Sequence, residues 1–238
     1  MSPFVPSTAV VIGASGGLGR AITEALLASG AEAVHALSRS DTAIPGAIAG
    51  RIDLRDEASI AAAAGRIGAP VDLVLVASGL LHGDRVSPER SYRELSPEAL
   101  ADSFAVNAIG PALVAKHFLP LLPRKGPAVF ACLSARVGSI TDNRLGGWYG
   151  YRASKAALNM LIRTLAIELA RTAPDAICVG LHPGTVDTAL SAPFQRGVPA
   201  ERLFTPTYSA ARLLEVLTTL TPAQSGGCFA WDGTPVPP

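Results

Sequence analysis

The chain has 238 residues, 49% hydrophobic and 16% charged, which is enough apolar surface to fold as one globular domain over residues 1–238. Its 20 basic and 19 acidic side chains give a net charge of +1 without a dense basic cluster, so we expect no nucleic-acid partner. No stretch approaches about 18 uninterrupted apolar residues, and no basic segment precedes an apolar one at the N-terminus. We therefore expect neither a membrane span nor a signal peptide, and a cytoplasmic location.

Strand-length apolar runs alternate with helical patterns along almost the whole chain. The expected strands are 8–12, 33–37, 48–52, 71–77, 128–133, 176–181 and 228–231, and the expected helices are 18–29, 57–67, 97–122, 151–171 and 207–220. This order predicts an α/β fold with a parallel sheet of about seven strands and helices on both faces. Gly110-Pro111 interrupts the third helix, which leaves open whether it is one kinked helix or two.

The first expected strand is followed directly by the stretch Gly13-Ala14-Ser15-Gly16-Gly17-Leu18-Gly19, which opens a helix. Such a turn exposes backbone N–H groups at the positive end of a helix, so it favours a pyrophosphate. No lysine follows the glycines, which argues against a P-loop. The stretch also matches Gly-x-Ser-x-Gly, which would make Ser15 a hydrolase nucleophile, but Ser15 follows only one strand.

The ends of the second and third strands bear on which dinucleotide the loop binds. No carboxylate follows the second strand to hold a ribose 2′-hydroxyl. Arg39, helped by Ser38 or Ser40, can instead hold a 2′-phosphate, so the sequence favours NADP(H) over NAD(H). Asp53 is placed either to accept a hydrogen bond from an adenine amino group or to cap the next helix.

Tyr151 and Lys155 are four residues apart at the start of the clearest helical pattern, so they share one helix face. A nearby ammonium group favours the phenolate, and we expect Lys155 to lower the pKa of Tyr151. The pair then forms a general acid and base. Three cysteines and four histidines show no metal-ligand spacing, so we predict no metal site and no disulfide framework.

With these motifs in order, the whole chain resembles the short-chain dehydrogenase/reductase family. The resemblance rests on Gly13–Gly19, Asp53-Leu54, Asn107, Ser134, Tyr151 with Lys155, and Pro183-Gly184. The stretch from Ser134 through Tyr151 looks like the branch that contains C-factor-like and sniffer-like carbonyl reductases. The resemblance implies a Rossmann-type doubly wound sheet.

It also implies roles for the catalytic groups. Tyr151 would protonate a carbonyl oxygen, Ser134 would donate a hydrogen bond to that oxygen, and Lys155 would also hold the nicotinamide ribose. Asn107 would anchor a water of a proton relay, and a bridging contact to backbone groups at a helix kink is compatible with that role. Ser134 lies 17 residues before Tyr151, farther than the family's usual spacing, so Ser139 remains an alternative.

The resemblance extends to the remaining cofactor contacts. The family's Asn-Asn-Ala-Gly stands here as Val76-Ala77-Ser78-Gly79, so only its backbone turn carries over. The family positions the nicotinamide carboxamide with residues that correspond to Val186 and Thr188. The complete expected cofactor set is Gly13, Ser15, Gly17, Leu18, Gly19, Ser38, Arg39, Asp53, Leu54, Ala77, Ser78, Gly79, Tyr151, Lys155, Pro183, Gly184, Val186 and Thr188.

The substrate end of the site is expected to draw on loops. Its candidate lining is Leu80, His82, Arg136, Asn143, Trp148, Leu190 and Phe194. Segment 185–207 is expected as a substrate loop, which either closes on binding or is a static surface loop. The apolar faces of helices 97–122 and 151–171, together with the resemblance, suggest a homodimer or homotetramer.

The sequence therefore predicts an NADPH-dependent enzyme that reduces a ketone or aldehyde to an alcohol, reversibly. Its partner would be a small-molecule carbonyl or alcohol substrate. An NAD(P)-binding cell-signalling protein with little turnover is the alternative, since some members of the branch are known for signalling. A serine hydrolase acting through Ser15 is the third possibility.

Overall fold

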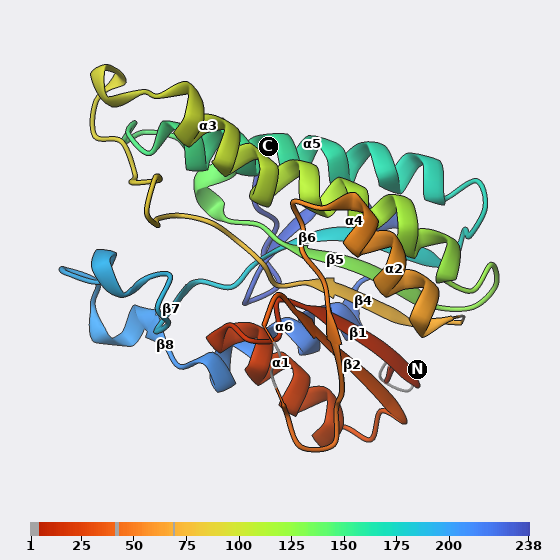
Figure 1. The fold of residues 1–238 in the computed structure, drawn as a ribbon. Coiled ribbons are helices and arrows are strands. Elements are labelled where there is room, and N and C mark those ends of the chain that lie inside the picture. The colour runs from red at the N-terminus through yellow and green to blue at the C-terminus, as the bar shows by residue number, and fades with distance from the viewer. Residues whose placement is uncertain (1–4, 41–42, 69) are drawn as a thin grey trace.

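A seven-stranded parallel sheet with helices on both faces forms the centre of this computed structural model, which describes residues 5–40, 43–68 and 70–238 (Figure 1). The strand order is β3-β2-β1-β4-β5-β6-β9. The strands are β1 Thr8–Ile12, β2 Ala33–Ser38, β3 Ile48–Arg51, β4 Leu73–Val76, β5 Ala128–Leu133, β6 Ala176–His182 and β9 Cys228–Ala230. This confirms the predicted doubly wound α/β fold.

Alternate strand residues build two separate core layers, because successive side chains of a strand point to opposite faces. In β1, Val10 and Ile12 pack in the layer beneath one set of helices, and Ala9 and Val11 pack in the other. All four side chains are fully buried. Continuous apolar runs of this kind are typical of parallel strands that are covered on both faces.

Two groups of helices cover the sheet (Figure 1). Helices α1 Gly17–Ala28 and α6 Pro206–Thr219 pack together on one face. Helices α2 Glu57–Ile67, α4 Gly110–Phe118 and α5 Tyr149–Leu169 cover the other. Shorter 3₁₀ turns occur at Tyr92–Glu94, Leu119–Leu121, Arg136–Gly138, Ala192–Phe194, Ala200–Arg202 and Pro222–Gln224.

The interrupted helix is one continuous run with a local defect. Helix α3 (Pro97–Phe104) passes through a π turn at Ala105–Ile109 into α4. A single widened turn next to Gly110-Pro111 absorbs the missing proline N–H without ending the helix. By length and composition the run Pro97–Leu121 is long and apolar enough to cross a membrane, but here it packs against α2 and α5 as a covering helix.

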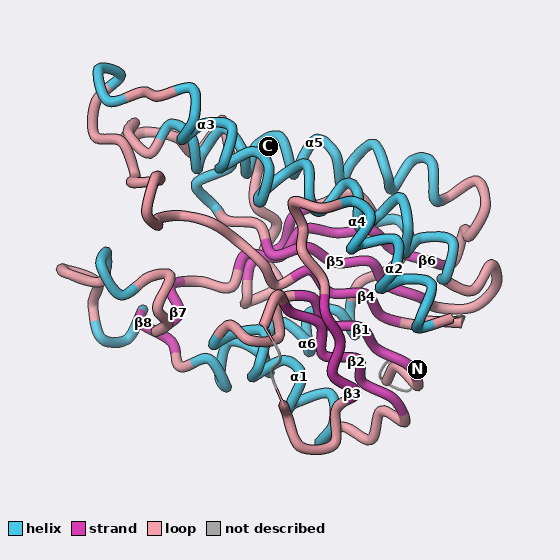
Figure 2. Tube along the Cα trace, in the orientation of Figure 1, coloured by secondary structure: helices cyan, strands magenta, loops and turns pink. Residues whose placement is uncertain are grey.

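The expected substrate loop contains its own small sheet. Strands β7 Thr185–Val186 and β8 Leu203–Phe204 pair in parallel, which the sequence pattern did not predict. Figure 2 shows them at one end of the molecule, apart from the main sheet. The C-terminal tail also docks on the body, because Val236 is buried and donates to the Cys228 carbonyl at 2.8 Å.

Candidate active site

A cavity of about 510 Å³ opens at the carboxyl ends of β1, β4, β5 and β6, where the strand order reverses direction. This is the place where open α/β sheets bind ligands. Every residue expected to bind the cofactor lines this cavity, namely Gly13, Ser15, Gly17, Leu18, Gly19, Ser38, Arg39, Asp53, Leu54, Ala77, Ser78, Gly79, Tyr151, Lys155, Pro183, Gly184, Val186 and Thr188.

The glycine loop turns tightly because side chains are missing where the backbone is closest. Gly13 has a φ of 93°, and a Cβ on Gly19 would lie 2.2 Å from the Gly13 carbonyl oxygen. Helix α1 therefore begins directly at the cavity wall, with its unpaired N–H groups at that end. Ser15 lines the cavity, and within residues 5–40, 43–68 and 70–238 its hydroxyl has no hydrogen bond to a histidine or carboxylate of the kind that activates a hydrolase serine.

At the end of β2, Arg39 is exposed and lines the cavity, while the buried Ser38 hydroxyl donates to the Ser40 carbonyl. Asp53 also lines the cavity, and its Oδ1 accepts from the Arg55 N–H at 3.0 Å. The alternative of Asp53 as helix cap is wrong. Asp56 caps α2 instead, because it stands directly before the first helical residue.

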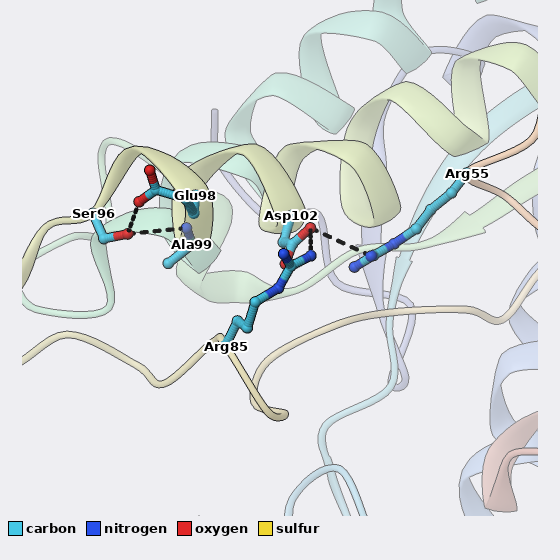
Figure 3. A network of polar contacts seen from close by, with 6 residues as sticks. All are labelled: Arg55, Arg85, Ser96, Glu98, Ala99 and Asp102. Atoms are coloured by element: carbon cyan, nitrogen blue, oxygen red, sulfur yellow. Dashed lines mark hydrogen bonds and ion pairs between the residues drawn. The ribbon is translucent and has the colours of Figure 1, made fainter.

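A polar network joins the cofactor side of the cavity to the loop after β4 (Figure 3). Asp102 on α3 pairs with Arg55 at 3.3 Å and with Arg85 at 3.0 Å. Ser96 caps the same helix by accepting from the Ala99 N–H at 3.3 Å. Arg55 also lines the cavity, so Asp102 fixes a cavity arginine that no sequence motif singled out.

Tyr151 and Lys155 both face the cavity from the first turns of α5. Lys155 Nζ donates to the Leu133 carbonyl oxygen at 2.8 Å and lies 5.8 Å from the centroid of the Tyr151 ring. Burial lowers the pKa of Lys155 to about 8 and raises the pKa of Tyr151 to about 12. The expected lowering of the tyrosine pKa is therefore wrong for this state, because burial disfavours the charged phenolate.

Ser134 follows β5, is almost fully buried and lines the same cavity as Tyr151. Its hydroxyl donates to Asn159 Oδ1 at 2.6 Å. The alternative serine, Ser139, does not line the cavity, since its hydroxyl binds the Pro238 carbonyl and the Asp142 N–H. Asn159 was not singled out from the sequence, although it continues the four-residue spacing of Tyr151 and Lys155.

Asn107 lies in the π turn and is fully buried. Its Oδ1 accepts from the Leu80 N–H, and its Nδ2 donates to the Leu80 carbonyl, both at 2.8 Å. The same Nδ2 lies 3.1 Å from Ser154 Oγ. Asn107 thus ties the loop after β4 to α5, the bridging arrangement that was expected to be compatible with a relay role.

The substrate end of the cavity is aromatic and apolar, with one guanidinium group. Of the expected residues, Leu80, Arg136, Trp148, Leu190 and Phe194 line it. The Trp148 ring lies 5.2 Å from Phe194 and 6.3 Å from Tyr151, centroid to centroid. Trp148 has a φ of 53°, an uncommon value outside glycine that places its ring beside the tyrosine.

Two expected lining residues lie elsewhere. His82 does not line the cavity itself; its Nε2 lies 3.1 Å from the Ala189 carbonyl oxygen, and its ring packs against Phe194. Asn143 belongs to a separate groove of about 250 Å³ beside α5. Its Oδ1 accepts from the Gly146 N–H, which folds the segment away from the cavity.

His182 ends β6 and lines the cavity, but was not singled out from the sequence. Burial and, to a lesser extent, Arg136 lower its pKa to about 4, against an opposing effect of Asp232. Its Nδ1 is buried without a partner among the described residues. Those residues contain no cluster of three or more His, Cys, Asp or Glu side chains able to hold a metal ion.

Comparison with known proteins agrees with this geometry. The short chain dehydrogenase family matches residues 7–198. The 1-hydroxy-2-glutathionyl-2-methyl-3-butene dehydrogenase of Rhodococcus sp. (strain AD45) is 32% identical over 96% of this chain and 98% of its own. The C-signal protein of Myxococcus xanthus is 37% identical over 58% of this chain and 78% of its own.

Solved structures show the same architecture. NADPH-bound carbonyl reductase from chicken fatty liver superposes with a TM-score of 0.85 at 26% identity, over 97% of this chain and 94% of that one. The carbonyl reductase Sniffer of D. melanogaster shares the fold, with a TM-score of 0.83 at 23% identity over 97% of this chain and 99% of that one. The chain is therefore an oxidoreductase of the short-chain dehydrogenase/reductase family.

Proposed function

We propose that this enzyme reduces an aldehyde or ketone to the alcohol with NADPH, and catalyses the reverse oxidation when alcohol and NADP⁺ are supplied. The observation that carries the proposal is the meeting of Tyr151, Lys155 and Ser134 in the cavity that the glycine loop also lines. A module that only binds a dinucleotide needs no such set of proton-transfer groups beside it.

The cavity fits a phosphorylated dinucleotide. Gly13 and Gly19 leave the backbone bare at the N-terminus of α1, where a pyrophosphate is stabilised by N–H groups and the helix dipole. Arg39 stands at the end of β2, where it would hold a ribose 2′-phosphate. When bound, NADPH supplies the hydride for the carbonyl carbon.

The protein's own groups act on the carbonyl oxygen. A raised pKa keeps the Tyr151 phenol protonated at neutral pH, as a proton donor must be. Ser134 would donate a second hydrogen bond to that oxygen as negative charge develops on it. Lys155, with a pKa of about 8, can exchange protons near neutral pH and would help to reprotonate the tyrosine after each turnover.

The names of the relatives support this class of chemistry, carbonyl reduction and the reverse alcohol oxidation. The Rhodococcus relative is by its name a dehydrogenase of a hydroxy compound, and the chicken liver structure is a carbonyl reductase with bound NADPH. A Burkholderia multivorans member of the family, 26% identical with a TM-score of 0.80, has bound NADP. The bound cofactors of these two structures favour NADP(H) over NAD(H), and the charge of Arg39 favours the same cofactor.

The first test is NADPH oxidation over a panel of aldehydes, ketones and quinones, with Tyr151→Phe as the matched variant. We expect turnover by the wild type and a loss of about 10³-fold or more in the variant, while NADPH affinity changes little. Binding of NADPH without turnover across the panel would count against the proposal and favour the signalling alternative, to which the likeness to C-signal would then lend weight.

Cofactor choice is tested separately with Arg39→Glu. A carboxylate at this position repels a 2′-phosphate and accepts from a 2′-hydroxyl. We expect NADPH affinity to fall by at least about tenfold and NADH affinity to rise, because one charge-assisted contact is worth roughly 1.5–3 kcal/mol. Equal affinities for both cofactors, unchanged in the variant, would contradict the preference.

A further inference from the structure

Asn159 is the hydrogen-bond partner of Ser134, at 2.6 Å between Ser134 Oγ and Asn159 Oδ1. It lies on α5 one turn beyond Lys155 and two turns beyond Tyr151, so the three side chains share one helix face. Helix α5 therefore contacts the end of β5 twice in succession, through Lys155 at the Leu133 carbonyl and through Asn159 at Ser134.

The direction of this hydrogen bond decides what Ser134 can do. A hydroxyl has one hydrogen and two lone pairs, so a hydrogen donated to Asn159 Oδ1 cannot also be donated to a substrate. If the amide turns by half a rotation, Nδ2 donates to the serine oxygen and the hydroxyl hydrogen becomes free. An amide has nearly the same shape in both orientations, so the site accommodates either.

The surroundings of Asn159 permit this rotation. The bond to Ser134 is the only hydrogen bond of its side chain within residues 5–40, 43–68 and 70–238, so turning the amide breaks no other contact. The terminal torsion of an asparagine side chain is also broad and costs little to rotate. Asn159 is half-buried, and its side chain bonds no other group in the described part of the chain, so its contact bears on the serine alone; Ser134 itself also lies beside the Cys228 thiol.

We propose that Asn159 is a positioning residue that sets the direction of the Ser134 hydroxyl. Without substrate, Oδ1 holds the serine hydrogen. When a carbonyl oxygen enters, the amide turns, Nδ2 donates to Ser134 and the serine donates to the substrate. The inference rests on the proposed function, because it takes the Ser134 hydroxyl as the donor to the carbonyl oxygen.

Two substitutions separate this role from a structural one. Asn159→Asp keeps the size of the side chain but only accepts while ionised, so it holds the Ser134 hydrogen as long as the carboxylate is charged. We expect kcat to fall about 10²-fold at pH 8, to the level of Ser134→Ala. Asn159→Leu leaves the hydroxyl free to turn, and we expect a loss below about tenfold. NADPH affinity should stay within about threefold of wild type in both variants.

The pH profile provides the sharper readout. The protonated carboxyl group of the Asn159→Asp variant is isosteric with the amide and can again donate, so the activity of this variant relative to wild type should recover as the pH falls. Ser134→Ala should show no such recovery. The titratable or charged groups that the described residues place around this position include Tyr151, Lys155, Cys132, His182, Cys228, Arg136, Arg163 and Asp232, and all of them are retained in these variants.

A double variant completes the kinetic test. 4-Nitrobenzaldehyde serves as the carbonyl substrate in these rate measurements. Asn159→Asp with Ser134→Ala should be no slower than Ser134→Ala alone, within about threefold. Multiplied losses, near-wild-type kcat in Asn159→Asp at pH 8, or equal losses in Asn159→Leu and Asn159→Asp would each overturn the inference. Full activity in Ser134→Ala would overturn it together with the proposed role of that serine.

One measurement needs no turnover. In the ¹H–¹⁵N spectrum of the unliganded protein, Ser134→Ala should shift the side-chain amide signals of Asn159, while Ser139→Ala should leave them in place. Unchanged signals in Ser134→Ala would overturn the inference even if the enzyme reduces its substrates. Shifted signals in a protein that reduces no carbonyl would support the contact while the proposed function fails.

Discussion

The Glu89 carboxylate holds the start of the helix that carries the active-site tyrosine. Both of its oxygens lie 3.2 Å from the Gly150 backbone nitrogen, and its own carbonyl accepts from the Trp148 N–H at 2.6 Å. Glu89 is only 5% exposed. A single buried residue therefore satisfies two of the free N–H groups at the N-terminal end of α5 and fixes the left-handed Trp148.

Glu89→Ala should lower the free energy of unfolding by about 2 kcal/mol, because the Gly150 N–H is left buried without a partner. Glu89→Gln keeps one acceptor and should cost less. Urea unfolding monitored by tryptophan fluorescence measures both. The matched control is Glu24→Ala, which removes an exposed carboxylate 3.7 Å from Arg20 and should change stability by less than about 0.5 kcal/mol. Equal stability of wild type and Glu89→Ala would contradict the anchoring role.

Gly19→Ala should abolish dinucleotide binding, because the new Cβ would lie 2.2 Å from the Gly13 carbonyl oxygen and force the loop open. Fluorescence titration with NADPH measures the loss, which we expect to exceed about 10²-fold. Gly65→Ala is the control, because a Cβ added at Gly65, on the exposed side of α2, would meet no atom within 4 Å. That variant should bind normally and gain roughly 0.5–1 kcal/mol of stability.

The buried imidazole of His182 should make the protein sensitive to acid. Its pKa is about 4 in the folded state against an ordinary value of 6.5, so below pH 6.5 the unfolded chain binds a proton that the folded chain does not. Stability should therefore fall as the pH drops from 6.5 to 4, by up to ~3 kcal/mol from this group. In His182→Gln the free energy of unfolding, measured at each pH, should fall less steeply over that range. A variant as acid-sensitive as the wild type would show that the imidazole is not buried uncharged.

The substrate loop should depend on the His82 contact for its position. His82 binds the Ala189 carbonyl at 3.1 Å and packs edge-on against Phe194, 5.6 Å between ring centroids. His82→Ala should raise the KM for a carbonyl substrate several-fold, with NADPH affinity little changed, because the cavity-lining residues Ala189 and Phe194 lose a contact that holds them in place. Arg196→Ala, an exposed change in the same segment, is the control. Equal KM effects in the two variants would contradict a specific role of His82.

The layers of the fold and the cofactor end of the cavity could be predicted from the sequence. Apolar runs such as Thr8–Ile12 predict strands, and the glycines of Gly13–Gly19 predict a tight turn. Both features depend on residues that are close together in the sequence. In a parallel sheet the ends of the strands meet at one edge, so residues that follow different strands come together there. All the residues expected at the cofactor therefore line one cavity.

The loops were less predictable, because their paths depend on contacts with distant parts of the chain. Asn143 and His82 were placed on the cavity by their position near motifs, but a turn bond to Gly146 and a bond to the Ala189 carbonyl direct them elsewhere. The choice between one helix and two at Gly110-Pro111 likewise depended on a π turn that no sequence pattern specified.

The sequence by itself determined the parallel α/β sheet, the glycine turn and the shared helix face of Tyr151 and Lys155, because each follows from spacing along the chain. Only the tertiary structure decided the protonation and hydrogen bonding of that face. Burial raised the pKa of Tyr151. The packing of α5 against the end of β5 brought Asn159 within hydrogen-bond distance of Ser134. Desolvation and hydrogen-bond geometry depend on which atoms surround a group in space, and sequence spacing does not contain that information.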